Sequence, residues 1–265
     1  MNVESVGLIY FSPTHTTKRV VEGIAQGLQA ATEQSYDLTR PDATSLTRQE
    51  MTQDLAIIGA PVYAGRLPPV MRARLKQLSG SGKPAAIVVV YGNRAYEDAL
   101  VELRDMALEV GFRPIAAGAF IGEHSYSTSG LPIAAGRPDA DDLLTACKFG
   151  KAIRKRLTAD SGGPSELLQV PGNVPYKEIR SLSGMAPSAN EALCSKCGKC
   201  VLVCPTAAID KANPTHAAIE LCVRCCACVK TCPSNAKRLD DPRIRRVAEW
   251  LHANFRDRKQ PETYW

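Results

Sequence analysis

The segment SVGLIYFSPTHTT, residues 5–17, joins a short apolar run to a loop that is rich in hydroxyl side chains. The run has the length and composition of a buried strand, and helical periodicity begins directly after the loop. A loop at a helix N-terminus offers free backbone N–H groups and the positive end of the helix dipole. We therefore predict a strand–loop–helix unit whose loop binds a phosphate; the alternative is an N-cap made by Thr14 or Thr16 with nothing bound.

The same alternation of apolar runs and helical patterns continues to about residue 158. Strands are predicted at residues 5–11, 35–38, 55–60, 85–91 and 115–121. Stripes at helical spacing mark the helices: Val20, Val21, Ile24, Ala25 and Leu28; Met71, Leu75 and Leu78; Leu100, Leu103, Ala107 and Val110; Leu143, Leu144, Cys147 and Leu157. This alternation indicates an α/β, doubly wound, five-stranded parallel sheet in the flavodoxin-like order 2-1-3-4-5.

Two further loops follow neighbouring strands of this predicted sheet. Residues 61–68 follow the third strand and residues 91–96 follow the fourth, so both lie at the carboxyl edge, where open α/β sheets bind ligands. Each loop contains a Gly and a Tyr, which suits a backbone wrapped closely around a flat aromatic ring system.

Eight of the ten cysteines form two copies of the spacing C-x2-C-x2-C-x3-C-P. Three thiolates at this spacing can converge on one iron–sulfur cluster, and the fourth ligand comes from the other run. We therefore predict two [4Fe–4S] clusters, one held by Cys194, Cys197, Cys200 and Cys232, the other by Cys222, Cys225, Cys228 and Cys204. Two structural zinc sites are the alternative. Cys226 breaks the spacing and is interpreted as a bystander, and Cys147 as a core residue.

The three loops and the cysteine runs together resemble the fused flavodoxin–ferredoxin proteins of the EFR-type ferredoxin family. The resemblance implies FMN as a second cofactor. It places the FMN phosphate at Ser12, Thr14, Thr16 and Thr17, and the flavin ring between Pro61, Val62, Tyr63, Ala64 and Gly65 on one side and Tyr91, Gly92, Asn93, Arg94 and Tyr96 on the other. His15 in the phosphate loop stands where the flavodoxin pattern usually has Gly, so a positive φ there would carry a backbone cost.

Composition and periodicity divide the chain into four parts. Residues 1–158 form the flavodoxin-like FMN-binding domain, 159–190 a linker rich in Ser, Gly and Pro, and 191–240 the two-cluster ferredoxin domain. Residues 241–265 form a C-terminal amphipathic helix and tail, with an apolar stripe at Ile244, Val247, Ala248, Leu251 and Phe255. The linker is too long for a simple turn, so part of it is expected to pack along one domain or to cover a cluster.

Charge and hydropathy exclude several classes of protein. The net charge of +6, from 33 basic and 27 acidic residues, is too small and too dispersed to indicate nucleic-acid binding. Basic clusters at residues 151–156 and 243–246 fit solvated helix faces, or a docking surface for an acidic redox partner or an anionic membrane surface. The absence of an apolar membrane-span-length stretch and of a secretory start predicts a cytoplasmic, oxygen-poor setting.

These features predict an electron-transfer iron–sulfur flavoprotein that relays low-potential electrons between two clusters and FMN, with a redox partner protein as donor or acceptor. One alternative is an FMN-dependent reductase of a small-molecule acceptor such as a quinone, with an open pocket bordered by Tyr63, Arg66, Tyr96 and His124. Another is a non-catalytic redox-sensing or metal-binding module. No hydrolytic catalytic group is predicted, and the linker permits contact between the domains within one chain or across a homodimer.

Overall fold

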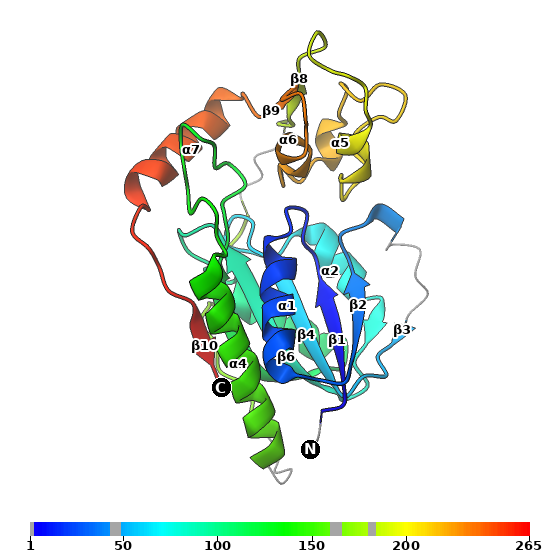
Figure 1. Cartoon of the computed structure of the whole chain (residues 1–265), viewed down its shortest axis with the longest axis vertical. Helices are drawn as coiled ribbons and strands as arrows, with labels where there is room; N and C mark the ends of the chain where they lie inside the picture. Colours follow the sequence, from blue (N-terminus) through cyan, green and yellow to red (C-terminus); the bar gives the residue numbers. More distant parts are fainter. Residues whose placement is uncertain (1–2, 43–48, 160–165, 180–183) are drawn as a thin grey trace.

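The larger of two bodies is built on a six-stranded sheet, and a smaller cysteine-rich body lies against one edge of it (Figure 1). The computed structural model describes residues 3–42, 49–159, 166–179 and 184–265. The elements in chain order are β1 (Ser5–Tyr10), α1 (Thr16–Leu28), β2 (Thr32–Asp37), β3 (Gln49–Glu50), β4 (Leu55–Pro61), α2 (Pro69–Leu75), β5 (Leu78–Ser79), β6 (Pro84–Tyr91), α3 (Ala99–Glu109), β7 (Arg113–Ile121), α4 (Ala140–Ala159), β8 (Ser188–Ala189), α5 (Lys199–Leu202), the 3-10 helix η2 (Ile219–Leu221), α6 (Ala227–Lys230), β9 (Lys237–Arg238), α7 (Pro242–Asn254) and β10 (Glu262–Tyr264).

Five strands of the sheet are parallel and run in the order β2-β1-β4-β6-β7. Numbered along the chain, these five strands have the predicted flavodoxin-like order 2-1-3-4-5, so the predicted fold class is confirmed. Every residue of β4 and β6 is buried, because helices cover both faces of the sheet. Burial on both faces explains why these strands read as continuous apolar runs.

The helices cover the sheet in two layers. Side chains of α1 and α4 form one apolar core against the sheet, and those of α2 and α3 form a second core on its other face. The predicted stripes on α1 and α3 are buried throughout. Two details of the stripes were wrong. Helix α2 ends at Leu75, so that Leu78 belongs to the short strand β5. In α4 only Leu157 of the predicted stripe is buried, and the rest of the buried face comes from other residues.

Close contact between α1 and α4 explains which face of α4 is buried. An added Cβ at Gly27 would lie 2.0 Å from the carbonyl oxygen of Cys147, and one at Gly150 would lie 2.0 Å from that of Ile24. The helix therefore turns its small residues toward α1, together with Phe149 and Ile153. Leu144 is left 53% exposed, and the side chain of Cys147 is only partly buried.

Replacement of Gly150 by Ala is expected to lower the free energy of unfolding by about 1–3 kcal/mol, because the new methyl meets backbone that cannot move aside as a side chain can. The higher helix propensity of Ala offsets at most about 1 kcal/mol of this loss. Urea denaturation followed by circular dichroism measures the change. Gly130→Ala is the matched control, since a Cβ there meets nothing within 4 Å; equal stability of the two variants would contradict the packing argument.

Part of the predicted linker packs along α3. Asp98 accepts hydrogen bonds from the backbone N–H groups of Asn173, at 2.8 Å, and Lys177, at 2.7 Å. Tyr176 donates to Asp105 at 2.6 Å, and Leu168 is buried in the core shared by α2 and α3. Residues 160–165 and 180–183 of the predicted linker lie outside the described residues.

The cysteine-rich body is an internal repeat with an offset of 28 residues. Non-glycine residues with positive φ recur at equivalent positions, since Lys196 (φ 53°) matches Arg224 (φ 55°) and Ala207 (φ 51°) matches Asn235 (φ 52°). The pairing of β8 with β9 joins Ala189 to Lys237. An isolated bridge joins Ala217 to Ile209, and these two residues lie 28 positions after Ala189 and 28 positions before Lys237. The same backbone path is thus followed twice.

The C-terminal residues return to the larger body. The predicted stripe of α7 is buried at Ile244, Ala248 and Leu251, and the last two of these pack against Ile133 of the loop after β7. Beyond α7, β10 pairs antiparallel with β7 and adds a sixth strand that the sequence did not predict. None of the helices in the described part of the chain is long and apolar enough to cross a membrane.

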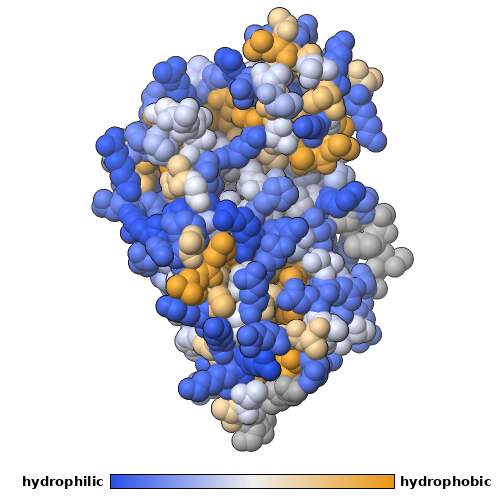
Figure 2. All heavy atoms as spheres, in the orientation of Figure 1, coloured by the Kyte–Doolittle hydropathy of each residue, from blue (hydrophilic) through white to orange (hydrophobic). Residues whose placement is uncertain are grey.

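Apolar residues are also exposed on the cysteine-rich body, at the top of the view in Figure 2. Leu202 on α5 is 82% exposed, and Ile219 and Leu221 of η2 are each 48% exposed. None of these three side chains belongs to the hydrophobic cores on the two faces of the sheet.

Candidate functional site

The loop between β1 and α1 presents, at the N-terminus of α1, backbone donors that have no partner in the described part of the chain. His15 has φ 65° and ψ −3°. It therefore adopts the left-handed conformation that the flavodoxin pattern usually gives to Gly at this position. Within the described residues, the N–H groups of Thr14, Thr16 and Thr17 have no recorded acceptor, and the buried Thr17 hydroxyl has no partner. These are the donors that a phosphate at a helix N-terminus would use.

Ser12 has a local structural role in the same loop. Its hydroxyl accepts a hydrogen bond from the N–H of Lys18 at 3.0 Å, and its own N–H donates to the hydroxyl of Thr39 at 2.7 Å. Both contacts hold the loop in place between β1 and α1. A phosphate would meet Ser12 in a conformation that the protein itself already stabilises.

A cavity of about 260 Å³, called the loop cavity below, opens at the carboxyl edge of the sheet. Its lining includes ten of the predicted FMN residues: Thr14, Thr16, Pro61, Val62, Tyr63, Ala64, Gly65, Tyr91, Gly92 and Arg94. Three loops from consecutive parallel strands therefore meet at one place, as expected for this fold. Ser12, His15, Thr17, Asn93 and Tyr96 are not among the lining residues.

Tight backbone conformations bring these loops close together. Ala64 has φ 54° and Gly65 has φ 81°, and a Cβ at Gly65 would lie 2.3 Å from a carboxylate oxygen of Glu97. A Cβ at Gly92 would lie 2.2 Å from the ring of His124. Glycine at position 92 therefore allows the loop after β6 to approach the loop after β7.

Two of the predicted flavin residues contact the C-terminal segment instead. The Asn93 side-chain amide donates to the carbonyl oxygens of Phe255, at 2.8 Å, and Asp257, at 2.9 Å, while its buried Oδ1 has no partner. The Tyr96 hydroxyl lies 2.8 Å from that of Tyr264. The C-terminal residues thus hold the loop after β6 in position.

Arg66, which was predicted to border an open pocket, does not line the loop cavity and contacts α3 and the segment 166–179 instead. Its guanidinium forms a two-point ion pair with Glu102 at 2.8 Å, and it donates to the carbonyl oxygen of Lys177 at 2.7 Å. It also lies over the Tyr176 ring, 4.6 Å from the centroid. Arg66 therefore anchors the loop after β4 to α3 and to residues 166–179.

His124 contributes a neutral imidazole to the loop cavity. Its Nδ1 accepts a hydrogen bond from the N–H of Tyr126 at 3.0 Å, which assigns the ring proton to Nε2. Burial lowers the pKa of His124 to about 4, with a further contribution from the positive charges of Lys230 and Arg94. The side chain is therefore a hydrogen-bond donor at neutral pH and carries no charge there.

The folded-state pKa of His124 lies below its unfolded value of 6.5, so the unfolded chain binds the proton more readily between pH 6.5 and about 4. The free energy of unfolding should therefore fall as the pH is lowered through this window. His124→Gln should make the fall shallower. Urea denaturation at several pH values measures the slopes, and parallel slopes for the wild-type protein and His124→Gln would contradict the assignment.

The sequence did not predict several residues that close the loop cavity. Val223 and Arg224 come from the second cysteine run, between Cys222 and Cys225, and Val247, Trp250 and Leu251 come from α7. The amphipathic pattern of α7 was the one sequence feature that predicted packing of this helix, which lies against the larger body. The contribution of the cysteine run depends on how the two bodies meet, which no local sequence pattern encodes.

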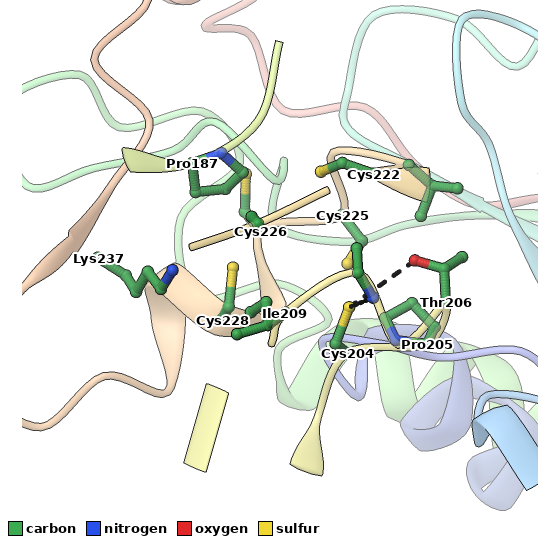
Figure 3. Close-up of a pocket in the computed structure, with 13 residues that line it drawn as sticks. Pro187, Cys204, Pro205, Thr206, Ile209, Cys222, Cys225, Cys226, Cys228 and Lys237 are labelled. Carbon is green, nitrogen blue, oxygen red and sulfur yellow. Dashed lines mark hydrogen bonds between the residues drawn. The ribbon is translucent and has the colours of Figure 1, made fainter. Parts of the chain in front are cut away.

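The eight cysteines of the repeated spacing line two smaller cavities. Cys194, Cys197, Cys200 and Cys232 line the first, called the distal cysteine cavity below. Cys204, Cys222, Cys225 and Cys228 line the second, called the proximal cysteine cavity (Figure 3). Each set consists of three cysteines from one run and the last cysteine of the other run, which is the grouping that the spacing predicted.

The sulfurs surround these cavities without meeting at a point. No three His, Cys, Asp or Glu side chains in the described ranges form a group tight enough for a single metal ion. Cys226 also lines the proximal cysteine cavity, but Figure 3 shows its sulfur directed at Pro187. It has φ 59° at the position where the first repeat has Gly198 with φ 73°.

Protein donors face the last cysteine of each run. The N–H of Ala208 donates to the sulfur of Cys204 at 3.2 Å, and the hydroxyl of Thr206 lies 3.7 Å from the same sulfur. In the second repeat the hydroxyl of Ser234 lies 3.7 Å from the sulfur of Cys232. Such donors stabilise thiolates, so the residues present fit an iron–sulfur cluster in each cavity.

The two bodies are joined by polar contacts. Lys230 on α6 forms a 2.6 Å ion pair with Glu123, which follows β7, and the buried Arg74 on α2 donates to the carbonyl oxygen of Pro205 at 2.7 Å. Arg74 also donates to the carbonyl oxygen of Leu38 at 2.7 Å. These contacts hold the proximal cysteine cavity beside the carboxyl edge of the sheet.

Two family models match the chain. Residues 16–126 match a family described as NADPH-dependent FMN reductase, and residues 187–210 match one described as 4Fe-4S binding domain. The chain therefore joins a flavodoxin-like domain to a 4Fe-4S domain. The second cysteine run lies beyond the segment that the 4Fe-4S model matches.

Several solved structures, among them flavodoxins, are similar to part of the chain. The Flv1 flavodiiron core from Synechocystis is 15% identical, with a TM-score of 0.43, over 60% of this chain and 37% of that chain. Flavodoxin 1 from Bacillus cereus is 18% identical, with a TM-score of 0.41, over 57% of this chain and 97% of its own. The FMN-bound flavodoxin from Fusobacterium nucleatum is 15% identical, with a TM-score of 0.37, over 58% and 97%. No curated protein matched the chain.

Proposed function

We propose that this protein relays low-potential electrons between two [4Fe–4S] clusters and one FMN within a single chain. The proposal depends on one observation: neighbouring cavities have a lining residue in common. Val223 lines both the loop cavity and the proximal cysteine cavity, and Lys237 lines both cysteine cavities. Three adjacent redox sites in a row are the arrangement that an internal relay requires.

The internal repeat supports two clusters rather than one. Both runs have the same cysteine spacing, the same left-handed backbone positions and a hydroxyl beside the last cysteine. In this proposal Cys194, Cys197, Cys200 and Cys232 hold the distal cluster, and Cys222, Cys225, Cys228 and Cys204 hold the proximal one. The last cysteine of each run would therefore tie the two halves of the repeat together.

Residues of the flavodoxin-like domain would hold FMN in the loop cavity. The free N–H groups at Thr14, Thr16 and Thr17 and the unpartnered Thr17 hydroxyl would bind the phosphate. The loops at 61–65 and 91–94 would contact the flavin ring, with the His124 Nε2–H as a neutral donor beside them. A bound FMN would supply storage for two electrons, whereas a cluster passes one at a time.

The C-terminal helix favours electron transfer over small-molecule turnover. Val223 and Arg224 from the cysteine-rich body and Val247, Trp250 and Leu251 from α7 also line the loop cavity. A flavin ring held there would have protein from outside the flavodoxin-like domain beside it, which leaves less room for an acceptor molecule to stack on the ring.

A second candidate function is reduction of a small organic acceptor at the flavin. The family description of residues 16–126 as an NADPH-dependent FMN reductase favours it, as do the polar side chains of Arg94, His124 and Arg224 in the loop cavity. The two functions differ in what reoxidises the flavin. A reductase is reoxidised rapidly by a quinone, whereas a relay is reoxidised by a protein.

Anaerobically purified protein is expected to contain roughly eight iron atoms and one FMN per chain, with a spectrum that bleaches on reduction. Iron and flavin analysis and visible absorption measure this. After reduction, slow flavin reoxidation by quinones and fast reoxidation by a ferredoxin-type protein are expected. Fast reoxidation by quinones alone would favour the reductase, and protein that holds zinc without flavin would refute both functions.

Cys204→Ser and Cys232→Ser are each expected to lose about half of the iron, because each removes the fourth ligand of one cluster. Cys226→Ser, at the cysteine outside the repeated spacing, should keep all of it. Reduction of FMN by a reduced low-potential ferredoxin should slow at least about tenfold in Cys204→Ser, since the cluster beside the loop cavity would be incomplete. Iron analysis and stopped-flow absorption test both points; an unchanged flavin rate in Cys204→Ser would show that the flavin takes electrons directly.

A further inference from the structure

Lys237 is a buried cation between the two cysteine cavities. Its side chain lines both cavities and is only 3% exposed. Figure 3 shows the end of the side chain directed at Cys228. The ammonium donates to the carbonyl oxygen of Thr215 at 3.3 Å, and no carboxylate in the described part of the chain forms a salt bridge with it.

A buried ammonium with one weak hydrogen bond is costly unless negative charge lies nearby. Removing such a group from water costs several kcal/mol, which a neighbouring opposite charge must offset. Among the side chains that line the two cavities, the cysteines are the ones that can carry negative charge. Thiolates that hold iron–sulfur clusters would supply that negative charge from both sides at once.

The internal repeat shows that the lysine is not required by the fold. The equivalent position in the first repeat, 28 residues earlier, is Ile209, which is 4% exposed and forms the equivalent β-bridge. An apolar side chain therefore satisfies the same backbone path and the same burial. The difference between the two positions is the charge.

We propose that Lys237 tunes both clusters by stabilising their reduced states. Adding one electron to a cluster makes it more negative by one charge, and a nearby buried cation favours that state and raises the reduction potential. Because Lys237 lies between the cavities, it acts on both clusters. This inference rests on the proposed two-cluster relay. In it Lys237 acts on the clusters through its charge and is not a ligand of either one.

The experiment compares three variants of the reconstituted full-length protein by redox titration followed by electron paramagnetic resonance. Lys237→Gln keeps a donor for Thr215 but removes the charge, Lys237→Arg keeps the charge, and Lys199→Gln removes an exposed lysine that lines the distal cysteine cavity alone. We expect Lys237→Gln to lower the potentials of both clusters. Lys237→Arg should keep them near the wild-type values, and Lys199→Gln should shift only the distal cluster and by less. The potential of FMN should stay the same in all three.

Unchanged cluster potentials in Lys237→Gln would overturn the inference, as would equal shifts in Lys237→Gln and Lys237→Arg. If Lys237→Gln fails to assemble clusters while Lys237→Arg assembles them with normal potentials, the charge is required and the inference stands. Loss of clusters from both variants would overturn it, because shape rather than charge would then decide. A wild-type protein without two reducible clusters would instead refute the proposed function itself.

Discussion

The parallel arrangement of the five strands is the constraint on which the rest of this structure depends. In a parallel sheet every strand ends at the same edge, so the loops after β1, β4, β6 and β7 must meet there. The first turn of α1 brings unpaired N–H groups to that edge, and Gly92 lets the loop after β6 approach His124. The loop cavity is the result of this convergence.

The cysteine-rich body covers that same edge. Arg74, buried and bonded to Pro205, and the ion pair of Lys230 with Glu123 hold it there. The contacts bring Val223 to the wall of the loop cavity, so that the second cysteine run and the loops of the sheet share one boundary. Residues 93 and 96 are in turn held by the C-terminal segment through Phe255, Asp257 and Tyr264.

Periodicity and spacing predicted most of the fold and the grouping of the cysteines. The strands and the stripes of α1 and α3 were predictable because burial on a sheet selects continuous apolar runs and helical stripes. The buried face of α4 was not, because Gly27 and Gly150 decide it through backbone contact rather than through hydrophobicity. Likewise β10 gains its partner β7 only once α7 has carried the chain back to the sheet.

The sequence by itself determined the parallel strand order, the hydroxyl-rich loop at residues 12–17 before the first helix and the two interleaved sets of four cysteines, because each depends on spacing along the chain. The tertiary structure alone decided which cysteine set lies beside the loop cavity, that α7 closes this cavity, and that Asn93 and Tyr96 contact the C-terminal segment. It also placed Lys237 between the two cysteine cavities, a position that its neighbours in the sequence do not reveal. These features depend on contacts between residues far apart in the chain, and such contacts leave no local pattern to read.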